Sequence, residues 1–390
     1  MGKWRNLPAE MLLEILTRLP TESVLDCKLV CNPWRSLVSH HPSFSQLHLT
    51  HLNHSAAESG KLSFLVESKM HQVHYLEYND DETPVHYTRR ININPPFECS
   101  FYKILGSING LVCLYGWGDD AHCICNPVTR EYVMLPKIRR DCDDRYRAGG
   151  FGYLPLTNEY KVVELYPLKE KLNVTEVAVY TLGSGNGWRI VARLDSVILE
   201  KVAGVFTSGA LYWKEAFNLH LLTEEGKLFV FDLTDEKFRK HVLLPPSPEE
   251  ANVWYSYFVG DLSGVLYYAS RERSAITGCI CFNIWLLKKN VILDMKEQVE
   301  DDPLTWSKEF SSLERKPLTI TKNGGVLSYD DKSLGIYDPK ASTSKKVVDF
   351  TAFKAIYTHQ NTLVSLKELG EKDIEIMELA EETGSRDSKI

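Results

Sequence analysis

The chain has 390 residues, of which 44% are hydrophobic and 25% charged, a balance typical of globular proteins and unlike that of disordered or fibrous chains. Its net charge of -7 provides no basic field to neutralise a phosphate backbone, so nucleic acid is not expected as the main partner. No apolar run approaches the roughly 18 to 20 residues that span a bilayer, and the first residues lack the apolar block of a signal peptide, so no membrane partner is expected either.

The first predicted element is a helix over residues 7–19. Its apolar residues Leu12, Ile15, Leu16 and Leu19 fall at i, i+3, i+4 and i+7, which places them on one helical face. This pattern indicates that one side of the helix is buried.

Two shorter helices are expected to follow. Pro20 ends the first helix, and Thr21 is expected to cap the second. Asn32-Pro33 interrupts the second helix, and a third then carries Trp34. Pro33 should be tolerated in the first turn of that third helix.

Three helices in about forty residues bury too little apolar surface to be stable alone, so they would gain stability by packing against a partner. One interpretation is a small helical cap folded onto the rest of the chain. A DNA-binding trio is the other, but the helices lack the clustered Arg and Lys that would grip phosphates.

Many positions in this segment follow a recognisable order and spacing: Leu7-Pro8, Glu10, Leu12, Ile15-Leu16, Leu19-Pro20, Ser23-Val24-Leu25, Lys28-Leu29-Val30-Cys31 and Trp34-Arg35. Together they resemble the F-box motif. The resemblance implies a helical module that binds a Skp-type adaptor, which in turn holds a cullin and the ubiquitin-loading machinery. It also implies the residues that contact the adaptor: Leu7, Pro8, Ile15, Leu16, Leu19, Pro20, Leu25, Leu29, Val30, Cys31 and Trp34.

After His48 the sequence changes to short runs rich in Val, Ile, Tyr and Phe, separated by Gly, Pro, Asn and Asp, which is typical of strands and tight turns. The clearest predicted strands are 62–66, 111–115, 162–165, 177–180 and 228–231. Clear helical periodicity is absent until the C-terminal end of the chain.

A loose repeat runs through these strands. Small-residue turns recur, as at Asn109-Gly110, Ser208-Gly209 and Ser263-Gly264. Asx turns are expected at Asn126, Asp232 and Asp338, where polar stretches follow strands. Each repeated unit is amphipathic, so radial stacking into a propeller of about six blades covers all of them. A β-sandwich is the alternative.

Tryptophans in these repeats are expected to fill the core between blades or to pack in turns, rather than to stack on a ligand. They are Trp188, Trp213, Trp285 and Trp306.

Segments 106–111, 150–153 and 158–163 are similar to the F-box-associated domain that is common in plant F-box proteins, and the likeness continues from Asn283-Ile284-Trp285 to Leu363-Val364-Ser365-Leu366. The resemblance implies a kelch-like propeller that presents variable loops to a protein target, and a plant source. The expected organisation is therefore α+β and multidomain: a three-helix F-box over residues 1–48, an all-β propeller over 49–370, and a polar, flexible tail over 371–390.

No catalytic or metal-binding constellation stands out, and no cofactor is expected. Cys123-x-Cys125 and Cys279-x-Cys281 could together form a four-thiolate zinc site, but buried apolar cysteine is the favoured interpretation. The glycine-rich stretch 183–187 lacks a following Lys-Ser or Lys-Thr and is expected to be a turn. Acidic clusters at 119–120, 141–144 and 301–302 are interpreted as solvated loops.

These features predict a substrate-recognition subunit of a Skp-cullin-F-box ubiquitin ligase, which is not itself an enzyme. Its propeller would bind an unidentified protein substrate for ubiquitination and degradation. The odd count of nine cysteines favours a reducing compartment, the cytoplasm or the nucleus or both. An F-box scaffold acting outside a ligase is the alternative, followed by a propeller enzyme.

Overall fold

The computed structural model describes residues 7–68, 72–80, 88–91, 93, 97–98, 102–138, 147–169, 171, 174–195, 203–214, 226–245, 254–273, 278, 280–289, 304–350 and 353–378. The chain divides into two compact units. The first holds Met1–Lys137, Leu182–Gly185 and Phe353–Lys389, and the second holds almost all of the remainder, as Ile138–Thr181 and Asn186–Ala352.

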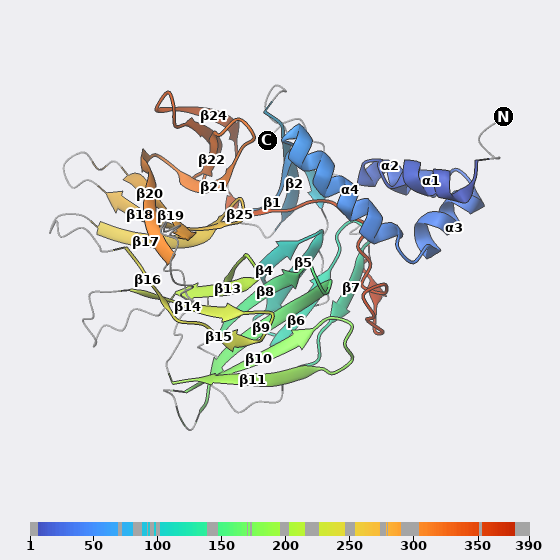
Figure 1. Cartoon of the computed structure of the whole chain (residues 1–390), viewed down its shortest axis with the longest axis horizontal. Helices are drawn as coiled ribbons and strands as arrows, with labels where there is room; N and C mark the ends of the chain where they lie inside the picture. The colour runs from blue at the N-terminus through green and yellow to red at the C-terminus, as the bar shows by residue number, and fades with distance from the viewer. Residues whose placement is uncertain are drawn as a thin grey trace, which may run out of the picture. The chain divides into compact units, whose positions relative to one another are not determined.

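Four helices open the first unit: α1 (Ala9–Leu16), α2 (Thr21–Cys27), α3 (Asn32–His40) and α4 (Phe44–Ser59) (Figure 1). The three expected short helices are therefore present. Pro8 and Pro20 stand at the N-caps of α1 and α2, and Pro33 lies in the first turn of α3, where its missing N–H costs nothing. Thr21 makes no capping bond, so its predicted capping role is wrong.

Helix α4 is a correction to the sequence prediction, which placed the change to strands at residue 48. Its buried face consists of Phe44, Ser45, His48 and Leu49, so half of it is polar and the apolar period is broken. Each polar member has a hydrogen bond to a residue distant in sequence: His48 Nε2 bonds to Leu19 O at 2.9 Å, and the Ser45 hydroxyl donates to Glu368. The helix ends at Gly60, whose φ of +70° suits glycine.

Two antiparallel sheets complete the first unit, in the strand orders β25-β1-β2-β3 and β26-β7-β6-β5-β4. We call them the closing sheet and the β4–β7 sheet. The closing sheet comprises β1 (Leu62–Ser68), β2 (Val73–Tyr78), β3 (Thr88–Ile91) and β25 (Phe353–Thr358). The β4–β7 sheet comprises β4 (Tyr102–Ile108), β5 (Leu111–Gly116), β6 (Ala121–Cys125), β7 (Glu131–Met134) and β26 (Glu375–Ile376).

Four further antiparallel sheets form the second unit. The first comprises β8 (Ala148–Leu154), β9 (Glu159–Pro167), β10 (Thr175–Thr181) and β11 (Trp188–Leu194). The next comprises β12 (Val205–Thr207), β13 (Ala210–Lys214), β14 (Lys227–Asp232), β15 (Lys237–Phe238) and β16 (Val242–Leu243). The last two comprise β17 (Trp254–Leu262), β18 (Val265–Arg273), β19 (Ile280–Lys289) and β20 (Leu304–Leu313), then β21 (Lys316–Ile320), β22 (Val326–Tyr329), β23 (Ser333–Asp338) and β24 (Thr343–Asp349).

Six separate sheets of four or five strands make the β-rich part of the chain a six-bladed β-propeller, as predicted, and not a sandwich. In five blades the main strands are consecutive in sequence. In the closing sheet the late strand β25 pairs with β1, with Val66 opposite Ile356. The closing sheet is therefore assembled from both ends of the propeller sequence.

The predicted turn chemistry is confirmed. Asn109-Gly110, Ser208-Gly209 and Ser263-Gly264 all have positive φ at both residues, the geometry of a tight hairpin turn whose twist matches that of the strands. Asn126 and Asp338 each accept main-chain N–H groups two and three residues ahead, as Asx turns do, and Asp232 does the same.

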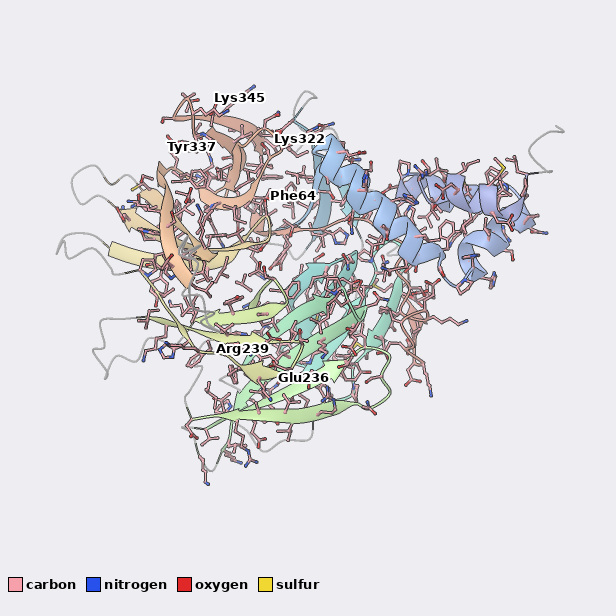
Figure 2. All side chains as sticks on the ribbon, viewed as in Figure 1. Phe64, Glu236, Arg239, Lys322, Tyr337 and Lys345 are labelled. Atoms are coloured by element: carbon pink, nitrogen blue, oxygen red, sulfur yellow. The ribbon has the colours of Figure 1, made fainter. Side chains whose placement is uncertain are left out.

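Core packing between neighbouring blades uses the apolar faces of the strands. Trp213 is 1% exposed between the β8–β11 and β12–β16 sheets, and Trp285 and Trp306 pack between the next pair. At the edge of the first of these interfaces, Lys161 donates to Leu233 O and to Glu236, each at 2.9 Å. Figure 2 labels Glu236. Trp188 packs against Tyr180 of the neighbouring strand in its own sheet, so its structural role lies within a blade and not between blades as predicted.

The expected tail boundary at residue 371 also differs from the structure. β26 pairs with β7, and Met377 is 3% exposed in the core of the β4–β7 sheet. Residues 371–378 are thus part of a blade. Among the helices of the described residues, none is long and apolar enough to cross a membrane.

Candidate docking surface

The N-terminal helices pack around a small apolar core. Its fully buried members are Leu16, Val24, Val38, Phe44 and, from the other end of the chain, Leu363. Partly buried side chains surround it: Leu13, Leu19, Leu25, Cys27, Trp34, Leu37 and Val128. Of the apolar face predicted from the helical periodicity, Leu16 and Leu19 lie in this core, whereas Ile15 is exposed and Leu13 packs inward instead, so that prediction is only partly right.

A second set of apolar side chains on these helices faces solvent. Leu29 is 77% exposed, Val30 63%, Met11 53% and Ile15 42%. Four of the ten large apolar side chains that are exposed in the described part of the chain therefore lie within residues 11–30. Such a concentration is typical of an interaction surface, because exposed apolar residues are otherwise scattered singly over protein surfaces.

The eleven residues that the resemblance implicates in adaptor contact are five exposed residues, five half-buried residues and the buried Leu16. Pro8, Ile15, Pro20, Leu29 and Val30 are exposed. Leu7, Leu19, Leu25, Cys31 and Trp34 are half-buried, and several of them support the helical core.

Leu16 departs from the expected role. It is 1% exposed in the centre of the core, so its side chain holds the helices together and offers no surface to a partner. Met11, which the resemblance did not include, is exposed next to the predicted set. Met11 lies four residues before Ile15 in α1, so the two exposed side chains share one face of the helix.

Charges on the helices are paired or flanked by opposite charges. Arg18 forms an ion pair with Glu14 one turn earlier and lowers the pKa of that carboxyl. Burial lowers the pKa of Lys28, while the nearby Glu131 and Glu368 act in the opposite direction. Burial also raises the pKa of the Cys27 thiol, which keeps it protonated and weakly nucleophilic.

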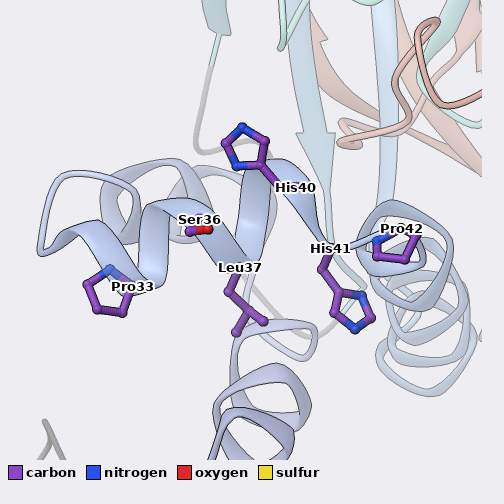
Figure 3. Close-up of a pocket in the computed structure, with 6 residues that line it drawn as sticks. All are labelled: Pro33, Ser36, Leu37, His40, His41 and Pro42. Atoms are coloured by element: carbon purple, nitrogen blue, oxygen red, sulfur yellow. The ribbon is translucent and has the colours of Figure 1, made fainter.

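A shallow depression of ≈ 390 Å³ lies along α3 and its connection to α4 (Figure 3). Its lining residues are Pro33, Ser36, Leu37, His40, His41 and Pro42. The apolar ring and methyl groups together with two imidazoles suit a partner's side chain better than a substrate, since the depression is open to solvent.

Comparison with known protein families assigns these helices to a domain family. Residues 4–46 match the F-box domain, and residues 57–290, more than half of the chain, match the F-box associated beta propeller domain. The chain belongs to the F-box proteins with an F-box-associated β-propeller. The match to the first segment assigns α1–α3 to the F-box, with α4 leading from it into the propeller.

Relatives with the same organisation occur in Arabidopsis thaliana. One F-box protein is 21% identical over 394 residues, covering 89% of this chain and 88% of the relative. An F-box/kelch-repeat protein is 24% identical, covering 93% and 94%. Kelch character in this chain itself stays a prediction. Among solved structures, the β-propeller domain of the Trilobed protease from Pyrococcus furiosus matches at 11% identity over 61% of this chain and 66% of the other, with a TM-score of 0.33 that adds nothing to the family assignment.

Outside the F-box, the candidate chemical groups have structural roles. Cys123 and Cys125 are fully buried in an apolar core, where a hydrogen bond with Cys125 and burial raise the pKa of Cys123. No cluster of metal ligands occurs among the described residues, and Cys279 of the other predicted pair lies outside them, as do the acidic clusters at 141–144 and 301–302. Gly183, Gly185 and Gly187 form the predicted turn between β10 and β11.

One Ser–His pair has the composition of a catalytic dyad. Ser107 Oγ lies 2.7 Å from His359 Nδ1, but the imidazole is 5% exposed and burial lowers its pKa to about 4. An imidazole of that pKa is a poor general base near neutral pH. The pair instead links β4 to the segment that follows β25.

Proposed function

We propose that this chain is the substrate-recognition subunit of a Skp-cullin-F-box ubiquitin ligase. Its F-box docks on a Skp-type adaptor, and through it on a cullin, while the propeller holds a protein target. The observation that carries the proposal is the exposure of four apolar side chains, Met11 and Ile15 on α1 and Leu29 and Val30 in the α2–α3 connection, on a helical module with a buried core.

The energetics suit docking of this kind. A stable interface buries on the order of 800 Å² per partner around a few apolar anchors. Leu29 and Val30 lie together in the α2–α3 connection and supply such anchors, and half-buried Leu7 and Trp34 extend the apolar area. Removing these side chains from water stabilises the complex by about 25 cal/mol for each Å² of apolar surface buried.

In this proposal the chain is not an enzyme, and another subunit delivers activated ubiquitin. The receptor contributes proximity and orientation, which alone accelerate a reaction between bound partners. The six cysteines that the structure describes are free thiols, which supports a location in the cytoplasm, the nucleus or both.

Co-purification with a Skp-type adaptor tests the proposal. The double variant Leu29→Asp/Val30→Asp should fold normally and lose the adaptor, because both side chains are exposed in the free protein. Ile190→Asp is the matched control, since Ile190 is 59% exposed on β11 of the propeller, and it should retain the adaptor. If the double variant binds as well as the wild type, the proposed surface is wrong.

A reconstituted ligase then separates the two roles of an F-box protein. Ubiquitin chains on a protein that co-purifies with the propeller support the receptor role. Adaptor binding together with a bound but unmodified protein would instead favour a scaffold that acts outside a ligase.

A further inference from the structure

The segment that follows β25, residues 359–371, passes along the F-box before the chain reaches β26. We call it the C-terminal strap. In Figure 1 it is the orange-red trace that leaves β25, follows α4 and turns down beside β7. Its central residues Thr362 and Leu366 are both fully buried, so the strap is built into the first unit.

On one side the strap binds the F-box and α4. Thr21 Oγ1 donates to Asn361 O at 2.7 Å, and Asn361 Nδ2 donates to Glu22 at 2.7 Å. The Ser45 hydroxyl donates to Glu368. Leu363 is 6% exposed among the core residues of the helices. The F-box core is therefore incomplete without the strap.

On its other side the strap binds the β4–β7 sheet. Asn126 Nδ2 donates to Thr362 O at 3.1 Å and to Val364 O at 2.8 Å. Thr362 Oγ1 donates to Asn109 O at 2.7 Å, and the Glu131 carboxylate accepts bonds from Ser365 Oγ and Leu366 N at 3.0 and 2.8 Å. Hydrogen bonds of this kind hold the strap in position, because breaking one leaves a polar group without a partner.

The residue type at position 126 is the one that binding of the strap requires. Asn126, Asp232 and Asp338 occupy the same place in three Asx turns, and each turn needs only the acceptor oxygen that Asn and Asp share. Only an amide can also donate to the two strap carbonyls. Asparagine thus stands where the strap is bound, and aspartate stands in the two turns of the second unit.

We propose that the C-terminal strap fixes the F-box in one orientation on the β4–β7 sheet, and that ubiquitin transfer to a target held by the propeller depends on this rigidity. Asn126, Glu131 and Thr362 are then positioning residues. The dependence of transfer rests on the proposed ligase function, whereas the fixed orientation does not.

The test uses the full chain with Asn126→Asp, which keeps the acceptor of the Asx turn but sets a carboxylate against two carbonyls. Asp338→Asn is the matched control, because both turns continue with proline and both have a left-handed residue four positions on, Arg130 and Ser342. Hydrogen exchange of the strap amides should accelerate about tenfold or more in Asn126→Asp and stay unchanged in the control.

In the reconstituted ligase the same variant should keep its adaptor affinity within about threefold and slow ubiquitin transfer about fivefold or more. If hydrogen exchange of the strap amides is unchanged in Asn126→Asp, the proposal that the strap fixes the F-box is wrong, whether or not the ligase is active. If hydrogen exchange is faster but ubiquitin transfer is undiminished, transfer does not depend on the rigidity of the strap. Failure of the wild type to bind any adaptor overturns the proposed function alone. If Asn126→Asp does not fold, Thr362→Val removes the bond to Asn109 with little change in shape and carries the same expectations.

Discussion

The hydroxyl of Thr21, at the start of the second F-box helix, donates a 2.7 Å hydrogen bond to the main-chain carbonyl of Asn361, more than three hundred residues later in the chain. Thr21 is 2% exposed, so the donor side of this bond is buried. The N-terminal helices and the strap are thereby joined in one folded unit. A fragment limited to the N-terminal helices would lack this partner and the apolar side chain of Leu363.

Leu16 and Leu29 should behave oppositely on truncation. Leu16→Ala removes a side chain that is 1% exposed and should destabilise the first unit by about 2–5 kcal/mol. Leu29→Ala truncates a side chain that is 77% exposed and should change stability by no more than about 0.5 kcal/mol. Urea unfolding measures both. Equal losses would show that Leu29 is buried in solution.

Gly110 should tolerate alanine much less well than Gly264. Both glycines end tight hairpin turns with φ near +85°, so both substitutions carry about 1–2 kcal/mol of backbone strain. A Cβ at Gly110 would also lie 2.1 Å from Thr362 Oγ1 of the strap, whereas nothing lies within 4 Å of one at Gly264. Gly110→Ala should therefore unfold at a clearly lower urea concentration than Gly264→Ala. Matching midpoints would mean that the strap does not cover this turn.

His359 should make the protein less stable in mild acid. Burial lowers its pKa from about 6.5 in the unfolded chain to about 4, so the unfolded state binds the extra proton between these pH values. Its contribution to stability is complete above about pH 6.5 and falls by roughly 1.4 kcal/mol per pH unit until about pH 4.

The comparison for His359 is urea unfolding of the wild type and His359→Gln at pH 7 and pH 5. The variant is expected to be weaker at pH 7, because the imidazole bonds to Ser107 and packs edge-on against Tyr75. Its further loss at pH 5 should be smaller than that of the wild type by about 2 kcal/mol. Parallel losses in the two proteins would exclude His359 as the titrating group.

Lys161 and Arg239 test how burial controls the value of an ion pair. Lys161 is 5% exposed and bridges Leu233 O and Glu236, so Lys161→Met should destabilise the second unit by about 1–3 kcal/mol. Arg239 pairs with Asp232 and Asp235 at an exposed turn, and Arg239→Met should cost about 1 kcal/mol or less. Figure 2 labels one residue of each site, Glu236 and Arg239. A larger effect at Arg239 would contradict this ordering.

Strands and turns were predictable because their signals are local. The Val- and Tyr-rich runs and the Asn109-Gly110 turn each specify their own backbone geometry, and the recurrence of these signals predicted about six blades. The F-box was predictable from the spacing of its apolar and proline residues. These parts of the fold depend on residues that are neighbours in sequence.

The features that sequence did not predict depend on contacts between distant residues. The polar residues Ser45 and His48 can lie on the buried face of α4 because each has a hydrogen bond to a distant residue, Glu368 and Leu19 respectively. Leu16 and Leu29 are both leucines in one motif, yet only the folded structure shows that the first is core and the second surface. Met377 follows an acidic stretch that suggested a flexible tail, but it is buried against the β4–β7 sheet.

Titration of the purified chain with a purified Skp-type adaptor, followed by calorimetry, tests the central proposal most directly. The wild type and Ile190→Asp should form a saturable one-to-one complex, and Leu29→Asp/Val30→Asp should bind at least about a hundredfold more weakly, as expected when two central apolar anchors are lost. No heat of binding for the wild type, or equal affinity for the double variant, would contradict the assignment of this surface as the docking site of a ligase receptor.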